Sequence, residues 1–457
     1  MKIIILGAGQ VGSSVAQSLA IEANDITVVD QDPALLSKLQ ERLDIRAING
    51  HASHPEVLVR AGIEDADLVL AVTSSDETNM VACQVAHSLF HTPTRLARVR
   101  SSRYLEHPEL FSPQAIPIDV LISPEALVTS SIARLIRNPG TLQILDFGGS
   151  RAQMVAVRVH SQARLAGMNL RDLLDLRHEL PMRVVAIFRQ DRLLALDADA
   201  VIRSDDEVFF LAASADIGRL VAAFRNPEGA VRRVLIAGGG NIGRRLAGEI
   251  ERDYRVKILE HDEARCRRLA EALDHTVVLH GDAADESLLI EEDIADTDVF
   301  CALTNDDEAN ILSAMLAKRL GARRAISIVN RLSYVEIAQG AAVDIAVSPA
   351  HVTIGALLTH VRRGDVVAVH SLRRGAAEAI EIIAHGDQKT SRVVGRRIAD
   401  IALPPSVVIG GIVRGENLLL ADRDMQIESE DHVIVFLADK RQIRVVERLF
   451  QVAIGFI

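Results

Sequence analysis

The sequence contains no tryptophan, and aromatic residues make up only 3% of its 457 residues. Proteins that hold single-stranded nucleic acid stack its bases on aromatic side chains, so this composition disfavours them. Basic residues are also in deficit, because the formal net charge at pH 7 is −11. Binding to nucleic acid or to anionic lipid needs a basic surface. We therefore expect no nucleic-acid partner.

Cysteine is scarce, and long apolar runs are missing. The three cysteines, Cys83, Cys266 and Cys301, have no Cys or His at metal-ligand spacing beside them, so neither a disulfide framework nor a zinc site is expected. Apolar residues form short runs that fall well below the roughly 20 residues of a membrane-spanning helix. The apolar start, Ile3–Leu6, leads into a glycine turn and predicts a strand instead of a signal peptide. We expect a cytoplasmic chain without direct membrane insertion.

The chain is an internal duplication. Gly7-Ala-Gly-Gln-Val-Gly12 recurs as Gly238-Gly-Gly-Asn-Ile-Gly243, an offset of 238 − 7 = 231 that also relates Thr73 to Thr304. Further along the offset falls to 225, so that residues 118–124 match residues 343–349. Such long-range agreement indicates two copies of one module.

Each copy divides into two parts. Short aliphatic runs alternate with helix-length amphipathic stretches in its front part, which predicts the α/β class with a doubly wound, Rossmann-like parallel sheet. Its back part holds strand-like runs such as Met154–Val159, Val184–Phe188 and Val208–Leu211, typical of a small, largely β subdomain of α+β type. The turn-forming segments 138–140 and 226–229 mark boundaries. The expected domains are 1–123, 140–226, 231–348 and 366–453.

The first glycine motif has the spacing of a dinucleotide fingerprint. Gly7 permits a tight turn after a strand, Gly9 lets a pyrophosphate approach the backbone, and Gly12 allows close packing of helix on strand. The N–H groups that open the helix attract phosphate. Asp30 ends the second strand, where it can accept hydrogen bonds from both ribose hydroxyls and would repel a 2′-phosphate, so NAD(H) or another adenine nucleotide is favoured over NADP(H). The predicted cofactor-binding residues of this copy are Gly7, Ala8, Gly9, Gln10, Val11 and Asp30.

The second copy repeats the motif, with Glu260 in the place of Asp30. The sequence leaves open whether this copy binds a nucleotide or keeps the turn only for packing. The corresponding predicted residues are Gly238, Gly239, Gly240, Asn241, Ile242 and Glu260.

Polar residues follow the fourth strand of each copy, at the sheet edge where ligands of doubly wound folds bind. Thr73-Ser74 and Thr304-Asn305 are therefore predicted to face the nucleotide. The acidic pairs Asp76-Glu77 and Asp307-Glu308 come next and are expected to cap the following helix.

One cation distinguishes the two predicted sites. Arg98 ends the fifth strand and can reach a phosphate or the face of an adenine, whereas alignment through Tyr104 and Tyr334 places Ile328 at the same position. The second site is therefore expected to differ in affinity or in ligand.

No catalytic group accompanies these motifs. A dehydrogenase presents an acid or base such as His, Lys or Tyr against the nicotinamide, but the small β subdomains are poor in Lys and Tyr. His51 and His54 lie in a loop without a third ligand, so no metal site is expected. We expect a nucleotide sensor and not an enzyme.

The motifs beyond the glycines closely resemble the TrkA family over essentially the whole chain. They are A-V-T-S-S-D-E-T-N-M-V-A-C-Q-V-A from Ala71 to Ala86 and N-D-D-E-A-N-I from Asn305. The resemblance implies a peripheral regulatory subunit of a bacterial Trk potassium-uptake system, with two tandem RCK (KTN) domains. One departure is His51 in place of the usual Asp, a change that also looks typical of this family.

Partners and ligands follow from the same resemblance. It implies a homotetramer whose eight RCK domains form a ring on the cytoplasmic face of the inner membrane, beneath a TrkH-type membrane protein. The ring would gate potassium uptake in response to NAD(H) and to ATP or ADP. An NAD-dependent oxidoreductase and a regulator of another cation transporter are the alternatives.

Overall fold

The computed structural model describes residues 1–20, 24–190, 192–225, 230–340, 343–361, 366–372 and 377–452. The boundary predicted at 226–229 lies outside these residues. The chain forms two compact units, Met1–Leu127 with Ala350–Arg362, and Val128–Pro349 with Arg363–Ile457. Independent folding of the four domains expected from the sequence stays a prediction.

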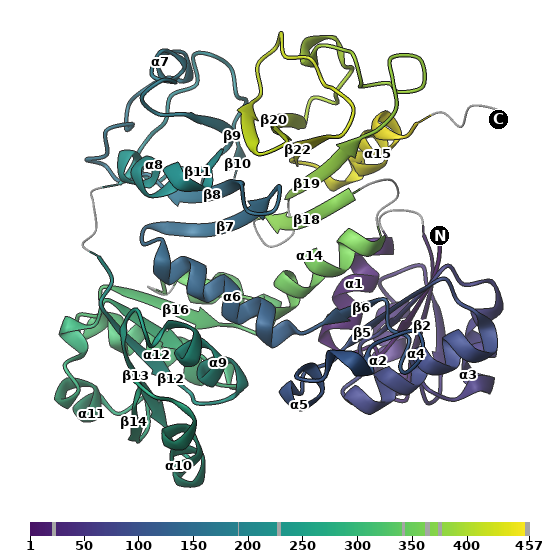
Figure 1. The fold of residues 1–457 in the computed structure, drawn as a ribbon. Coiled ribbons are helices and arrows are strands. Elements are labelled where there is room, and N and C mark those ends of the chain that lie inside the picture. The colour runs from purple at the N-terminus through teal and green to yellow at the C-terminus, as the bar shows by residue number, and fades with distance from the viewer. Residues whose placement is uncertain are drawn as a thin grey trace. The chain divides into compact units, whose positions relative to one another are not determined.

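The first unit contains a parallel sheet with the strand order β3-β2-β1-β4-β5-β6 (Figure 1). The order reverses between β1 and β4, which is the signature of a doubly wound sheet, and ligands of such sheets bind where the carboxyl ends of these two strands meet. The strands are β1 (Lys2–Leu6), β2 (Asp25–Asp30), β3 (Arg46–Asn49), β4 (Leu68–Ala71), β5 (Thr94–Arg98) and β6 (Val120–Ile122).

Helices of this unit bury their apolar faces on the sheet. One side of the sheet presents Ile4 and Val69 to Leu58 and Cys83 of two helices. Another helix starts inside the glycine motif and buries Val11, Val15 and Leu19. The helices are α1 (Gln10–Ala20), α2 (Pro33–Gln40), α3 (Pro55–Ala61), α4 (Asp76–Phe90), α5 (Ser102–Leu105) and α14 (Pro349–Val361), while α6 (Pro124–Arg137) leads from this unit into the other.

The second unit repeats the parallel sheet with the order β14-β13-β12-β15-β16-β17. Leu235, Leu259 and Phe300 of this sheet pack against Leu289 and Ala314 of the covering helices. Its strands are β12 (Arg233–Ala237), β13 (Arg255–Glu260), β14 (Val277–His280), β15 (Val299–Ala302), β16 (Arg324–Ile328) and β17 (Ile345–Val347). Its helices are α9 (Asn241–Ile250), α10 (Glu263–Ala272), α11 (Glu286–Glu291), α12 (Asp307–Arg319) and α13 (Leu332–Gly340).

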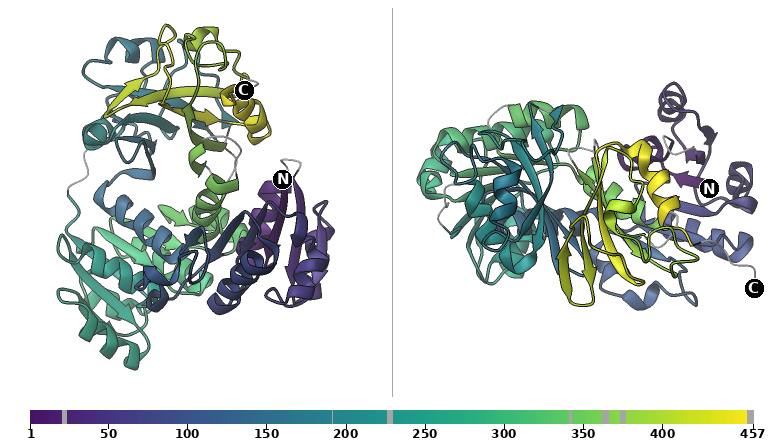
Figure 2. Two further views of the ribbon diagram at one scale, coloured as in Figure 1. Left: turned by 45° about the vertical axis from the view of Figure 1, so that its right-hand side comes forward. Right: turned by 90° about the horizontal axis from the view of Figure 1, so that it is seen from above.

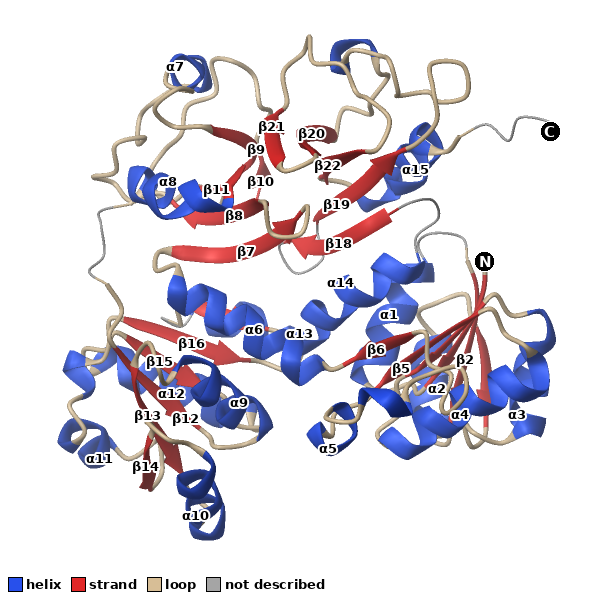
Figure 3. Ribbon diagram, in the orientation of Figure 1, coloured by secondary structure: helices blue, strands red, loops and turns tan. Residues whose placement is uncertain are grey.

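Two antiparallel sheets complete the second unit, and Figure 3 shows their largely β composition. The first has the order β10-β9-β11-β8-β7 and the second β18-β19-β22-β20-β21. The elements of the first are β7 (Thr141–Phe147), β8 (Ala152–Arg158), α7 (Leu170–Asp175), β9 (Met182–Arg189), β10 (Arg192–Leu193), β11 (Glu207–Ala213) and α8 (Ile217–Phe224). Those of the second are β18 (Val366–Leu372), β19 (Ala377–Ala384), β20 (Val407–Arg414), β21 (Asn417–Leu420), β22 (Asp431–Leu437) and α15 (Ile443–Phe450).

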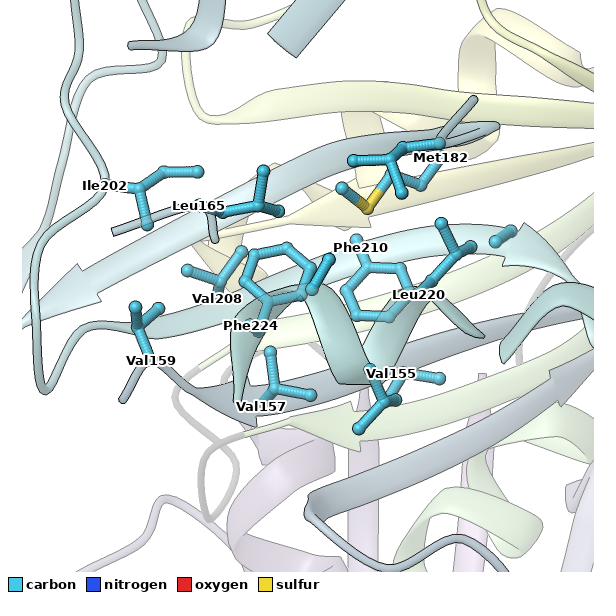
Figure 4. Packing of buried hydrophobic residues seen from close by; sticks show 14 of the residues in the cluster. Val155, Val157, Val159, Leu165, Met182, Ile202, Val208, Phe210, Leu220 and Phe224 are labelled. Atoms are coloured by element: carbon cyan, nitrogen blue, oxygen red, sulfur yellow. The ribbon is translucent and has the colours of Figure 1, made fainter. Parts of the chain in front are cut away.

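Both subdomains have the α+β character predicted from the sequence. In the first, Phe210 and Phe224 stack with ring centroids 5.2 Å apart inside a core that includes Val157 and Leu220 (Figure 4). The two sheets also share a core, in which Phe147 and Leu211 lie with Phe436, and they run side by side in Figures 1 and 2. The predicted fold class, with two doubly wound sheets each followed by a small subdomain, is confirmed.

Candidate functional site

The glycine turn of the first sheet is tightly packed inside and open outside. Gly7 has φ +111°, and a Cβ atom there would lie 3.0 Å from the backbone of Thr73 at the end of β4. A Cβ atom on Gly12 would lie 1.8 Å from the carbonyl oxygen of Gly7, so α1 can approach β1 only with glycine at this position. A Cβ atom on Gly9 would meet nothing within 4 Å. The backbone of Gly9 is therefore approachable from solvent.

Asp30 lies at the end of β2 and holds this turn in place. Its carboxylate accepts hydrogen bonds from the backbone N–H groups of Ala8, at 2.6 Å, and of Asp32, at 2.9 Å. The side chain is half-buried, which leaves its oxygens partly open at the sheet edge. Gln10 and Val11 form the first turn of α1 directly beyond Gly9. The predicted residues 7–11 and Asp30 thus meet at one place.

Thr73 stands beside this turn, but its hydroxyl group is already engaged. It donates to the side-chain oxygen of Asn79 at 2.7 Å, and the Asn79 amide in turn donates to the carbonyl of Arg98 at 2.9 Å. Ser74 is exposed. Asn79 organises this edge although sequence reasoning did not select it as a site residue. Its recurrence as Asn310 at the common offset was the available signal.

The acidic residues after β4 do not cap α4, contrary to expectation. Ser75 is the N-cap residue, and its side chain accepts the N–H of Thr78. The Asp76 carboxylate turns instead to the loop after β5, where it accepts hydrogen bonds from the N–H groups of Arg100 and Ser101 at 3.0 and 2.9 Å. In the second copy Asp306 caps α12, and Asp307 binds the loop after β16 in the same way. The residue before each helix already satisfies its first N–H groups, which frees the next carboxylate for tertiary contacts.

Two arginines and two carboxylates gather where β4 and β5 end. Arg98 donates to the carbonyl of Thr73 at 2.6 Å, and Arg100 donates to the carbonyl of Ser74. Burial, followed by the neighbouring charge of Arg100, lowers the pKa of Arg98. Burial raises the pKa of Glu125, which interacts electrostatically with both arginines.

This cluster retains unused hydrogen-bonding capacity. Arg98 Nε, Asp76 Oδ1 and Glu125 Oε2 are buried and have no hydrogen-bond partner within the described chain. Most buried polar atoms in proteins are paired, so these three suit a polar ligand at this edge. Sequence reasoning missed Arg100 and Glu125, since neither belongs to a recognisable motif.

The second sheet repeats the turn with a more enclosed carboxylate. Gly238 has φ +104°, and a Cβ atom on Gly243 would lie 2.0 Å from the Gly238 carbonyl oxygen. Glu260 is 2% exposed and accepts hydrogen bonds from the N–H groups of Gly239 and Asp262, both at 2.9 Å. The guanidinium of Arg265 adds a contact at 3.2 Å. Burial opposes ionisation of Glu260, but these hydrogen bonds and Arg265 outweigh it and lower its pKa.

Side chains of α10 account for this enclosure. A Cβ atom on Gly239 would lie 2.3 Å from Cδ1 of Leu269, so the side chain of α10 reaches the glycine turn itself. Arg265 was missed by sequence reasoning, because only the fold brings the first turn of α10 back to the end of β13. Gly240 remains open outward, as Gly9 does, and Asn241 and Ile242 begin α9.

Polar side chains at the sheet edge beyond β15 form hydrogen bonds with one another and with the backbone. Thr304 donates to Asn310 at 2.7 Å, and Asn305 is exposed. Ile328 is 2% exposed, and its carbonyl accepts from Asn310 as that of Arg98 does from Asn79, so the two positions are equivalent. Asn330 stands where the first copy has Arg100, and its backbone and side chain both donate to Asp307. Among the described residues of this edge, Ile328 and Asn330 thus stand in place of Arg98 and Arg100.

Two protein-family models match the chain. The TrkA-N domain matches residues 3–124 and 234–349, and the TrkA-C domain matches residues 154–225 and 388–451. The chain belongs to the TrkA family. Named members of this family support the assignment along the entire chain. Trk system potassium uptake protein TrkA from Halomonas elongata is 56% identical over 100% of both chains, and that from Vibrio alginolyticus is 53% identical over 99% of both.

Solved structures share the fold of this TrkA-family chain. The GsuK RCK domain has a TM-score of 0.61 at 16% identity, covering 98% of this chain and 94% of that one. A GsuK channel bound to NAD has a TM-score of 0.61 at 18% identity, covering 98% of this chain and 79% of that one. The similarity identifies both copies as RCK-type folds.

The TrkA-family relatives are named as potassium-uptake proteins and not as enzymes. Within the described residues, His51 and His54 stack with centroids 4.6 Å apart, and no group of three or more His, Cys, Asp or Glu side chains is arranged to hold a metal ion. None of the described helices combines the length and the apolar composition needed to cross a bilayer.

Proposed function

We propose that this chain is the nucleotide-responsive regulatory subunit of a potassium-uptake system and acts without catalytic turnover. The observation that carries the proposal is the open turn at Gly9, flanked by Asp30 and by the underused cluster around Arg98, at the switch point of the first sheet. Ligands of doubly wound sheets bind at this position. Membership of the TrkA family supplies the link to potassium.

The nucleotide of the first copy is NAD(H), in competition with ATP or ADP. Its phosphates would lie over Gly9 and the N–H groups of Gln10 and Val11, at the positive end of the α1 dipole. The Asp30 oxygens would accept the ribose hydroxyls, while retaining their contacts with the turn. Arg98 and Arg100 carry the charge needed for phosphate groups that extend past β4.

The second copy binds nucleotide more weakly or selects a different one. Glu260 is already held by two N–H groups and by Arg265, and a ribose would have to compete with these partners. Phosphates that pass the turn would meet Ile328 and Asn330 in place of arginine. The residues available at this site are those predicted from the motif, from Gly238 to Ile242 together with Thr304 and Asn305.

Equivalent apolar side chains on both Rossmann-like domains support assembly into a ring. Val59 and Ile290 are 43% and 56% exposed, and Val81 and Leu312 are 49% and 62% exposed. Each pair is related by the offset of 231 (290 − 59 and 312 − 81). Surfaces repeated on identical units can form a closed ring, so we assign them to contacts among eight RCK domains of a homotetramer.

The ring would lie on the cytoplasmic face of the membrane and gate a TrkH-type subunit by a population shift. A ligand moves such an equilibrium only by binding one state better than the other. A tenfold preference corresponds to about 1.4 kcal/mol per site, so four coupled sites would supply about 5.6 kcal/mol, and about 5.5 kcal/mol converts a 1:99 population to 99:1. Modest selectivity at the first site therefore suffices.

Potassium flux through a reconstituted TrkH-type partner tests this function. NADH and ATP should change the flux in opposite directions, each reversing the other by competition, while the absorbance of NADH stays constant. Flux that ignores both nucleotides would refute regulation. Steady NADH oxidation that follows the flux would indicate an oxidoreductase instead.

Ring assembly has a separate test. Val81→Asp combined with Leu312→Asp should convert the tetramer to smaller species in native mass spectrometry, because both repeated faces then carry charge. Leu174→Asp is the matched control, since Leu174 is 59% exposed on α7 of the small subdomain. A tetramer that survives the double substitution would place the contacts elsewhere.

A further inference from the structure

A second concave surface lies at the amino edge of the second parallel sheet, opposite the edge that carries the glycine turn. It has a volume of about 570 Å³ and is bounded by the starts of β12 and β13, the edge strand β14, and the turns that precede β13 and follow α11. These strands and α11 are labelled in Figure 1. Small-molecule sites have volumes of about 300 to 1,000 Å³. We call this surface the amino-edge pocket.

Four cations line the amino-edge pocket, although the whole chain is acidic. Arg233 pairs with Asp296 at 2.7 Å, and Lys257 pairs with Glu292 at 2.7 Å. Arg252 and Arg255 are exposed and form no ion pair with any described residue. Two guanidinium groups thus keep their full donor capacity toward a ligand.

Three carboxylates also line the pocket, those of Glu251, Glu292 and Asp293, and Glu292 pairs with Lys257. Glu251 accepts hydrogen bonds from the N–H of His275 at 3.0 Å and from the hydroxyl of Thr276 at 2.8 Å. These two hydrogen bonds stabilise the negative charge of Glu251 and fix the carboxylate against the start of β14. This leaves the rim near Arg252 and Arg255 suited to an anion.

An apolar floor lies beside these cations. Val277 belongs to the edge strand and is 51% exposed, and Leu235 and Val256 also line the pocket. Tyr254 stands between the two free arginines in the sequence, and partial burial raises the pKa of its phenol. Guanidinium groups next to an aromatic ring and an apolar floor suit an anion with an apolar or planar body.

The first copy lacks this chemistry. The strand registers place Asp25 opposite Lys2 where the second copy has Arg255 opposite Arg233, so the charge at one position is reversed. Thr27 replaces Lys257 by the same register. The cations of this pocket are therefore not required by the fold.

We infer that the amino-edge pocket binds a small organic anion, whose phosphate or carboxylate oxygens contact Arg252 and Arg255 and whose body lies against Tyr254 and Val277. Paired guanidinium groups bind either kind of oxygen in bidentate geometry. This site is distinct from the carboxyl-edge nucleotide sites and does not depend on their function.

The test uses the full-length protein with three probes: inorganic pyrophosphate, citrate and phenyl phosphate. Calorimetry is performed with saturating NADH and again without it. A probe that binds only in the absence of NADH occupies a glycine turn and not the amino-edge pocket. Arg252→Gln with Arg255→Gln should weaken binding of at least one probe by about tenfold or more, the range for loss of charge-assisted hydrogen bonds. The matched control is Arg267→Gln with Arg268→Gln, two exposed arginines of α10 outside the pocket.

A chemical footprint provides the second readout. The probe that binds should protect Arg252 and Arg255, but not Arg267 and Arg268, from modification by phenylglyoxal. A preference for pyrophosphate or citrate identifies the oxygen class, and tighter binding of phenyl phosphate than of pyrophosphate supports the apolar body. Absence of binding by all three probes at about 1 mM, or equal loss in both variant pairs, overturns the proposal. NADH affinity measured in the same variants reports separately on the nucleotide sites.

Discussion

The two glycine turns share a backbone and differ in what surrounds their carboxylates. Asp30 is half-buried and its carboxylate accepts hydrogen bonds from backbone N–H groups, whereas Glu260 is 2% exposed and also contacts Arg265. Beyond the turn, the first copy gathers Arg98 and Arg100, while the second closes the same edge with Asn330. Duplication thus preserved the geometry that positions phosphates and allowed the charges that select a ligand to diverge.

Removing the glycines at the strand–helix contacts should produce the largest effect. Gly12→Ala forces a Cβ atom to within 1.8 Å of a carbonyl oxygen, and Gly243→Ala forces one to within 2.0 Å. Overpacking of this kind costs about 1 to 3 kcal/mol, and displacement of the helix should abolish nucleotide binding at the affected turn. Calorimetry with NADH on each variant shows which turn binds it. Equal losses in the two variants would remove the distinction between the sites.

Substituting the carboxylates should separate ligand binding from folding. Asp30→Ala is expected to weaken NADH binding by about 1.5 to 3 kcal/mol, the value of a charge-assisted hydrogen bond. Glu260→Ala should chiefly lower the thermal unfolding midpoint, because it leaves the N–H groups of Gly239 and Asp262 without their acceptor. Unchanged NADH affinity in the Asp30 variant would show that the first site is assigned wrongly.

Two arginines should act in opposite senses. Arg98→Ala is expected to weaken nucleotide binding at the first site by about 1 to 2 kcal/mol, through loss of a cation beside the phosphates. Arg265→Ala should strengthen binding at the second site, because it releases Glu260 from a competing partner. Titration of the full chain, fitted to two classes of site, checks both. If Arg265→Ala weakens the second site, the arginine is itself a ligand contact.

The smallest expected effect is a pH dependence of stability. Since the pKa of Glu260 is lowered in the folded protein, its ionised form contributes stability above the unfolded-state pKa, and this contribution is lost as the pH falls through the folded-state pKa. The difference in free energy of unfolding between the wild type and Glu260→Gln should therefore shrink as the pH falls below 4.5, the ordinary pKa of Glu. Thermal unfolding from pH 7 to pH 3 measures the gap. A gap that widens toward low pH would contradict the sign.

Much of this architecture follows from local sequence signals. Runs such as Val184–Phe188 and Val208–Leu211 became β9 and β11, because a short apolar run between turns has few alternatives to a strand. Strand β7 was not predicted, since Thr141, Gln143 and Asp146 interrupt its apolar pattern. Residues 141–147 form a strand because they pair with β8. A pairing partner elsewhere in the chain leaves no signal in the local sequence.

The sequence by itself determined the duplication, the two Rossmann-like sheets and the place of the glycine turns, because these depend on spacing and on residues with special backbone freedom. Only the tertiary structure decided which side chains surround each glycine turn. It turned Asp76 toward the loop after β5, brought Arg100 and Glu125 to Arg98, and carried Arg265 back to Glu260. These contacts join side chains on separate strands and helices, and their distances depend on packing that no local pattern encodes.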